Sequence, residues 1–143
     1  MQLPLREFAD VITALKGPGD RAGPSEKRRA ARMTVTARVT LHLIDNNRVA
    51  RSFSAITRDI SITGMGLLQS VALSLKQNVI VALPRPHVPP LFVVSTVVVC
   101  RPLADGLLTV GLEFAEMASK ETIDILLDDG SREKARIQES VLR

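Results

Sequence analysis

Residues 33–43 alternate apolar and polar side chains without a break. The apolar members are Met33, Val35, Ala37, Val39, Leu41 and Leu43, with Thr, Arg and His residues between them. A period of two is the period of a β-strand, and it predicts a strand with one face on the core and one face in water. A chain with such a segment is not all-helical, so partner strands are expected elsewhere in it.

Turn signals divide the rest of the chain into further strand candidates. Asp45-Asn46-Asn47 is typical of a tight turn, and the apolar stretch after it predicts the returning arm of a hairpin. A proline-rich loop over 84–90 and an Ala104-Asp105-Gly106 turn separate the later candidates. Six strands with no long helix between them favour antiparallel neighbours and a small barrel or sandwich. The expected strands after the first are 49–58, 65–69, 78–83, 91–101 and 107–114.

Helical periodicity occurs at the two ends. Apolar residues recur at three- and four-residue steps from Leu5 to Leu15, which predicts a short helix over 3–16. Near the other end, Ser119 is a suitable helix cap and Gly130 a suitable stop, so a helix is expected to cover the strands. We expect three regions: an N-terminal helix with a Gly/Pro linker (1–25), a barrel domain with its helix (26–130) and a charged helical tail (131–143).

Composition narrows the class of protein. Hydrophobic residues make up 45% and charged residues 24% of the 143 residues, which is typical of a globular protein. There is no Trp or Tyr, which counts against binding of nucleic acid on aromatic platforms. The single cysteine, Cys100, predicts a reduced, cytoplasmic setting. The start lacks the order of a signal peptide, and the apolar run 91–100 is too short to span a membrane, so no membrane insertion is expected.

Groups for catalysis or metal binding are scarce. His42 falls on the polar face of a strand, His87 falls in the proline-rich loop, and neither has metal-motif spacing to another ligand. Cys100 follows three valines, where a small buried hydrophobe is expected rather than a nucleophile. Because no activated group can be named, we expect no enzymatic activity, no metal and no cofactor.

A basic segment lies just before the first strand. Arg28 and Arg32 are four residues apart, so one helical turn would present two guanidinium forks to a single anion or purine. The formal net charge of +4 also suggests an anionic partner. An ordinary solvated charge run would look the same.

The second feature is Asp59-Ile60-Ser61-Ile62-Thr63-Gly64, at a break between two expected strands. The ordinary interpretation is a turn in which Asp or Ser bonds the local backbone and Gly64 takes a positive φ. The functional one is a guanine site: the Asp59 carboxylate accepts from N1 and N2 of the base, Ser61 adds a hydrogen bond, and Gly64 lets the ligand approach the backbone. Arginine forks complement such a site, because guanine O6 and N7 accept from them.

These two segments resemble the signatures of the PilZ domain family, bacterial receptors for cyclic di-GMP. The family pattern is Arg-x-x-x-Arg in an N-terminal arm and Asp/Asn-x-Ser-x-x-Gly on the barrel, matched here by 28–32 and 59–64. The late segment 111–114 also looks like the last barrel strand of the family, and the resemblance covers roughly residues 26–128. One departure is Lys76, where many members have a turn glycine.

The resemblance implies an all-β fold, a six-stranded antiparallel barrel with a C-terminal helix, that binds cyclic di-GMP without catalysis. Arg28 and Arg32 would hold phosphates and guanines, and Asp59, Ser61 and Gly64 would line the base site. The further basic residues that would add charge are Lys27, Arg29 and Arg58.

Two functions follow from the resemblance. The favoured one is a second-messenger receptor, in motility or biofilm regulation, that passes a conformational change to an unidentified protein partner. In that mechanism the ligand orders residues 17–32 and repositions the helix of residues 3–16. The alternative is a PilZ-like interaction module that docks a motility or secretion component without nucleotide. General nucleic-acid binding is a third and less favoured function, because aromatic platforms are missing and the net charge is modest. The oligomeric state is left open.

Overall fold

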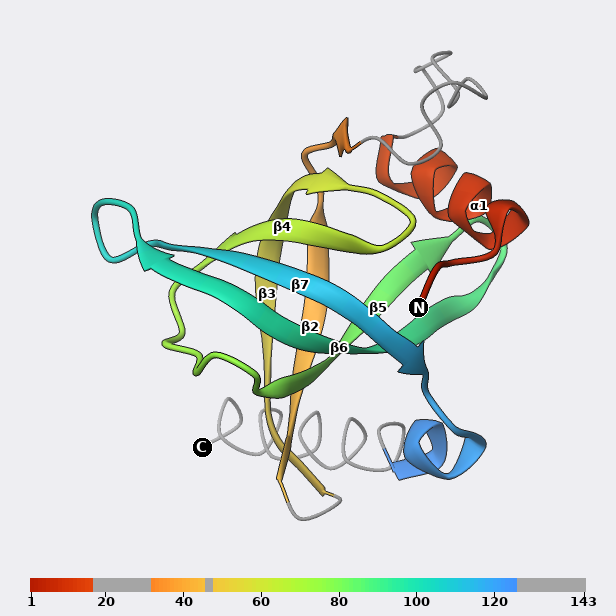
Figure 1. Cartoon of the computed structure of the whole chain (residues 1–143). Coiled ribbons are helices and arrows are strands. Elements are labelled where there is room, and N and C mark those ends of the chain that lie inside the picture. Colours follow the sequence, from red (N-terminus) through yellow and green to blue (C-terminus); the bar gives the residue numbers. More distant parts are fainter. Residues whose placement is uncertain (17–31, 46–47, 126–143) are drawn as a thin grey trace, which may run out of the picture.

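The computed structural model describes residues 1–16, 32–45 and 48–125 (Figure 1). It is mostly β, with one helix before the strands and another helix after them. A helix of residues 120–125 follows the last strand. The other elements, in chain order, are α1 (Leu5–Lys16), β1 (Met33–Thr34), β2 (Arg38–Asp45), β3 (Arg48–Ile60), β4 (Gly64–Gln69), β5 (Asn78–Arg85), β6 (Val88–Pro102) and β7 (Leu108–Met117).

The strands form a closed antiparallel barrel. Neighbouring strands follow the order β3-β2-β5-β6-β7-β4, and β4 pairs again with β3, which closes the sheet on itself. The short β1 lies outside the barrel and pairs with the end of β3. The expected six-stranded antiparallel barrel is thus confirmed, with one additional outside strand.

An aliphatic core fills the barrel, because alternate residues of each strand point inward. On β7, for example, Val110, Leu112 and Phe114 are buried, whereas Glu113 is exposed. Phe114 and the helix residue Phe8 are the two aromatic rings among the largest fully buried side chains. Most of the other buried side chains of the core are Val, Leu and Ile.

Helix α1 belongs to the core rather than to the surface. Its apolar stripe (Phe8, Val11, Ile12 and Leu15) is buried, and the helix packs against β5. The chain just before it is anchored as well, since the Leu3 amide donates to the Ile62 carbonyl at 2.7 Å. The N-terminal helix is confirmed, and it is held against the loop between β3 and β4.

The expected continuous strand over 33–43 is wrong, because the chain leaves the ladder between β1 and β2. There the Thr57 hydroxyl of β3 is buried and bonds both backbone groups of Ala37, accepting from its N–H at 2.9 Å and donating to its carbonyl at 3.0 Å. The Thr57 hydroxyl thus takes the place of one backbone partner of Ala37. Backbone hydrogen bonds from the Val35 amide to the Arg58 carbonyl at 3.1 Å and from the Thr57 amide to the Ala37 carbonyl at 2.8 Å keep this stretch along β3.

The expected proline-rich loop is also wrong. β5 and β6 continue through most of the prolines to a two-residue turn at Pro86 and His87. His87 has φ 63°, and proline followed by a positive φ is the pattern of a type II turn. In contrast, the Asp105–Gly106 turn between β6 and β7 is confirmed. Both of its central residues have positive φ, as a type I′ hairpin turn requires.

The C-terminal helix begins where the sequence predicts. The Ser119 hydroxyl accepts from the Thr122 amide at 3.2 Å, which is a helix cap. Ile44 of β2 lines one cavity together with Glu121 and Ile125, so the first turns of this helix lie beside the barrel wall. The expected stop at Gly130 and the tail 131–143 lie outside the described residues. Among the described residues, no helix is long and apolar enough to cross a membrane.

Candidate functional site

The two signature segments meet at one ion pair. Arg32 and Asp59 are 27 residues apart in the chain, yet the Arg32 guanidinium donates to Asp59 Oδ1 at 2.6 Å. Strand β1 makes this contact possible, because it pairs Thr34 with Asp59 directly after Arg32. Both side chains are partly open to solvent, 52% exposed for Arg32 and 32% for Asp59. An incoming ligand can therefore reach both groups.

The neighbouring strand β4 holds the Asp59 carboxylate in place. Gly66 lies opposite Asp59, and its backbone N–H donates to Asp59 Oδ1 at 3.1 Å. A Cβ at Gly66 would lie 3.0 Å from that same oxygen. Because Gly66 has no side chain, the carboxylate can lean over the backbone of β4. Gly66 is thus a positioning residue that the sequence analysis missed.

Ser61 lies in the loop between β3 and β4 and is buried. Its hydroxyl accepts from the Thr63 amide at 3.2 Å, and its own amide donates to the Gly64 carbonyl at 2.8 Å. The loop is therefore closed by its own hydrogen bonds, and Ser61 shapes it from within.

The expected positive φ at Gly64 is wrong. Among the described glycines, only Gly106 has a positive φ, and Gly64 begins β4 in a strand conformation. The requirement there is steric: a Cβ on Gly64 would lie 2.2 Å from the Leu112 carbonyl oxygen of β7. Gly64 lets the two backbones approach and is buried beneath the site.

Of the basic residues expected at the site, the structure describes Arg32 and Arg58. Arg28, Lys27 and Arg29 lie outside the described residues. Arg58 lies beside Asp59 on β3, and its guanidinium donates to the Thr109 hydroxyl of β7 at 2.9 Å. Its side chain therefore crosses the width of β4 on the outside of the barrel.

The outer surface next to Asp59 contains two glycines on neighbouring strands, which contribute no side chains of their own. Gly66 of β4 pairs directly with Gly111 of β7, and Gly111 pairs with Val99 of β6. A bulge at this point of β6 places Val98 beside Val99, and both side chains lie over Gly111. We call these residues (Asp59, Gly66, Gly111, Val98 and Val99) the glycine row.

The glycine row has an acidic end and an aliphatic end. The two glycines are visible in the sequence, but only the strand register brings them together. The bulge has no clear sequence signal either. In the part of the chain that the structure describes, no group of three His, Cys, Asp or Glu side chains is arranged to hold a metal ion.

The fold corresponds to a known family of domains. Residues 26–128 match the PilZ domain family, and the chain belongs to that family. No curated protein matches the chain.

Two solved structures are similar in fold. K. pneumonia MrkH in complex with c-di-GMP is 14% identical, with a TM-score of 0.48 over 82% of this chain and 53% of that one. The Bacillus subtilis inhibitor of motility (MotI/DgrA) is 15% identical, with a TM-score of 0.44 over 83% of this chain and 56% of that one. The chain spans about half the length of these proteins.

Proposed function

We propose that this chain is a non-catalytic receptor for cyclic di-GMP. The observation that carries the proposal is the Arg32–Asp59 ion pair, which unites the arginine arm and the barrel signature at one solvent-accessible place. Membership of the PilZ domain family supports the same function.

The groups at the site complement a guanine nucleotide. The Asp59 carboxylate accepts hydrogen bonds, and guanine offers two neighbouring donors at N1 and N2. Arg32 offers donors both to guanine O6 and N7 and to a phosphate. Ligand binding would replace the Arg32–Asp59 pair by guanine donors on Asp59 and by a phosphate or guanine acceptors on Arg32, so both groups would keep hydrogen-bond partners.

The glycine row suits a flat base without aromatic stacking. Gly66 and Gly111 add no side chains of their own, so the groups that cover this surface are the Asp59 carboxylate over Gly66 and the Val98 and Val99 side chains over Gly111. A base can bind Asp59 at one end of the row and bury apolar area against the valines at the other. The chain, which lacks Trp and Tyr, thus has an aliphatic wall instead of an aromatic platform.

Calorimetric titration tests the proposal. We expect cyclic di-GMP to bind and cyclic di-AMP to bind far more weakly, because adenine does not present the same donors to Asp59. Arg32→Ala should weaken binding at least about tenfold, the effect of losing one charge-assisted hydrogen bond. Arg28→Ala should act in the same direction.

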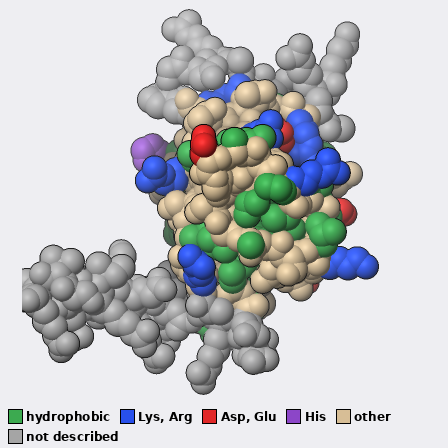
Figure 2. Space-filling model, turned by 90° about the vertical axis from the view of Figure 1, so that its left-hand side faces the viewer, with side chains coloured by type: hydrophobic (Ala, Val, Ile, Leu, Met, Phe, Trp, Pro, Cys, Tyr) green, Lys and Arg blue, Asp and Glu red, His purple; other side chains and the backbone are tan. Residues whose placement is uncertain are grey.

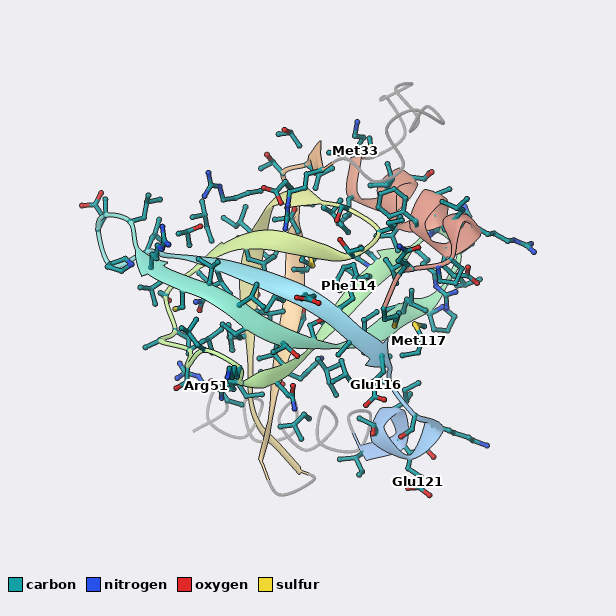
Figure 3. All side chains as sticks on the ribbon, in the orientation of Figure 1. Met33, Arg51, Phe114, Glu116, Met117 and Glu121 are labelled. Carbon is teal, nitrogen blue, oxygen red and sulfur yellow. The ribbon has the colours of Figure 1, made fainter. Side chains whose placement is uncertain are left out.

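Arg51→Ala is the matched control. Arg51 is exposed and lies at the opposite end of the barrel from Met33, the neighbour of Arg32 (Figure 3). Arg38 is a poorer control, because it pairs with Ile56 close to the site. If Arg51→Ala weakens binding as much as Arg32→Ala, the attraction is diffuse charge.

Other ligands distinguish the alternatives. Absence of cyclic di-GMP binding at low salt would overturn the receptor function and favour an interaction module that works without nucleotide. Tighter binding of an oligonucleotide than of cyclic di-GMP would instead indicate a nucleic-acid-binding protein.

A further inference from the structure

A second row of side chains runs beside the glycine row on the outside of the barrel. Leu68 of β4 pairs with Thr109 of β7, and Thr109 pairs with Arg101 of β6. Thr109 is two residues from Gly111 on β7, so the two rows are about 7 Å apart by the rise of a strand. Arg101 is exposed and extends from the strand next to Thr109.

Two arginines flank Thr109, one bonded to it from β3 and one paired with it on β6. Arg58 comes from β3 and donates to the Thr109 hydroxyl at 2.9 Å. Arg101 comes from β6, and paired residues on adjacent antiparallel strands have Cβ atoms about 5 Å apart. Both guanidinium groups are thus within reach of one ligand atom above Thr109.

Within the part of the chain that the structure describes, no acidic side chain balances the charge of this pair. Among the described residues, Asp59 pairs with Arg32, and neither Arg58 nor Arg101 forms an ion pair. Like charges brought together across strands are unfavourable unless an anion lies between them. Figure 2 shows the side of the barrel from which the β6–β7 hairpin projects, where Lys and Arg side chains border a group of hydrophobic ones.

The geometry points to an anion subsite formed by Arg58, Thr109 and Arg101, which takes a phosphate ester group. Two arginine forks supply directed donors that match phosphate oxygens, and the Thr109 hydroxyl can donate its own hydrogen to the same group while it accepts from Arg58. Arg101 and Thr109 are thereby new ligand-binding residues.

The subsite lies where a dinucleotide would extend. A base held at Asp59 and lying along the glycine row has the Arg58–Arg101 pair on its flank, one row away. This assignment to a phosphate of cyclic di-GMP rests on the proposed function.

The test is a calorimetric titration of the full chain with cyclic di-GMP in four forms: unmodified, Arg101→Ala, Arg101→Lys and Arg51→Ala. We expect Arg101→Ala to bind about tenfold more weakly and to show less loss of affinity with added salt. Arg101→Lys should recover part of the affinity, because it restores the charge without the fork. The control Arg51→Ala should stay within about twofold of the unmodified chain, because exposed charges more than a Debye length from the ligand are largely screened. Equal binding by Arg101→Ala and Arg51→Ala would overturn the inference.

A second measurement separates this inference from the proposed function. Inorganic pyrophosphate, a probe with phosphate but no base, is added to labelled protein while NMR records the Thr109 amide and the Arg101 Nε–H. We expect both signals to shift, and the Thr109 shift to disappear in Arg101→Ala. If they shift although cyclic di-GMP does not bind, the anion subsite stands and the receptor function falls. If pyrophosphate shifts neither signal and cyclic di-GMP does not bind, both fall.

Discussion

Gly64 and Gly66 lie two residues apart on β4, and the surroundings of the two residues differ. At Gly64 a side chain would meet the backbone of β7, with its Cβ 2.2 Å from the Leu112 carbonyl oxygen. At Gly66 it would meet the carboxylate of Asp59, the end of a side chain that can turn away. A side chain at Gly64 would therefore disturb the packing of β4 against β7, whereas a side chain at Gly66 would displace the Asp59 carboxylate.

Gly64→Ala should therefore destabilise the barrel. Because two backbones must separate to admit the methyl group, we expect a loss of about 1–3 kcal/mol in the free energy of unfolding. At about 3 °C per kcal/mol, thermal denaturation followed by circular dichroism resolves this loss. An unchanged melting temperature would show that β4 and β7 accommodate the methyl group without loss of stability.

Gly66→Ala should leave the fold intact and weaken ligand binding. The added methyl group displaces the Asp59 carboxylate from the Gly66 amide, so we expect weaker cyclic di-GMP binding with a melting temperature close to that of the unmodified chain. The two variants serve as controls for each other, since each adds the same methyl group to the same strand. Normal binding by Gly66→Ala would mean that the position of Asp59 is not critical.

The strands were largely predictable, and the connections less so. Alternation located the segment that contains β2, because one buried face and one wet face impose a period of two, and turn signals delimited the apolar stretches of the other five barrel strands. The gap after Thr34 was not predictable, since it depends on the Thr57 hydroxyl of another strand. The prolines at 84–90 suggested a loop, yet they occupy the ends of two strands. Similarly, the signature residues predicted the candidate site, but Gly66 and the proposed subsite residues Thr109 and Arg101 are brought next to Asp59 and Arg58 only by the strand register.

The connection between β4 and β5 contains a strained residue. Lys76 has φ 68°, in the left-handed region that costs an ordinary side chain about 1–2 kcal/mol. It is the position where many family members have a turn glycine, so the sequence difference corresponds to real strain. The Lys76 amide also donates to the Val97 carbonyl at 2.7 Å, a bond that glycine would keep.

We therefore expect Lys76→Gly to raise the free energy of unfolding by about 0.5 kcal/mol. This is the relief of backbone strain minus the larger conformational entropy that glycine loses on folding. Urea denaturation should show a higher midpoint with an unchanged slope. Leu75→Gly is the control: Leu75 is exposed and has no positive φ, so glycine there should only destabilise. A lower midpoint for Lys76→Gly would show that the Lys76 side chain stabilises the protein by more than its left-handed backbone conformation costs.

At the scale of the whole molecule, α1 opposes the expected repositioning of residues 3–16 by ligand. Its four buried side chains each gain about 1.5–3 kcal/mol from burial, which is lost if the helix leaves the barrel. The Leu3–Ile62 hydrogen bond also ties the helix to the signature loop. We now propose that ligand binding orders the arginine arm while α1 stays in place.

Hydrogen exchange tests this mechanism. Amides of Val11 and Ile12 should be equally protected with and without saturating cyclic di-GMP, whereas amides from Arg28 to Arg32 should gain protection when ligand is added. Loss of protection in α1 on binding would restore the moving helix as the signal. Equal protection of the arm in both states would instead place the signal elsewhere, with the C-terminal helix as the first candidate.

Closure of the barrel also decides how another protein can recognise this one. Each strand from β2 to β7 has a neighbour on both sides, so the described barrel offers no long row of unpaired backbone groups to an added strand. A partner must therefore read side chains, and the exposed apolar residues concentrate on the β6–β7 hairpin, where Leu103 is 57% exposed and Val98 46%. Because Val98 also closes the glycine row, a partner that covers this hairpin and a nucleotide in the site would touch the same residue.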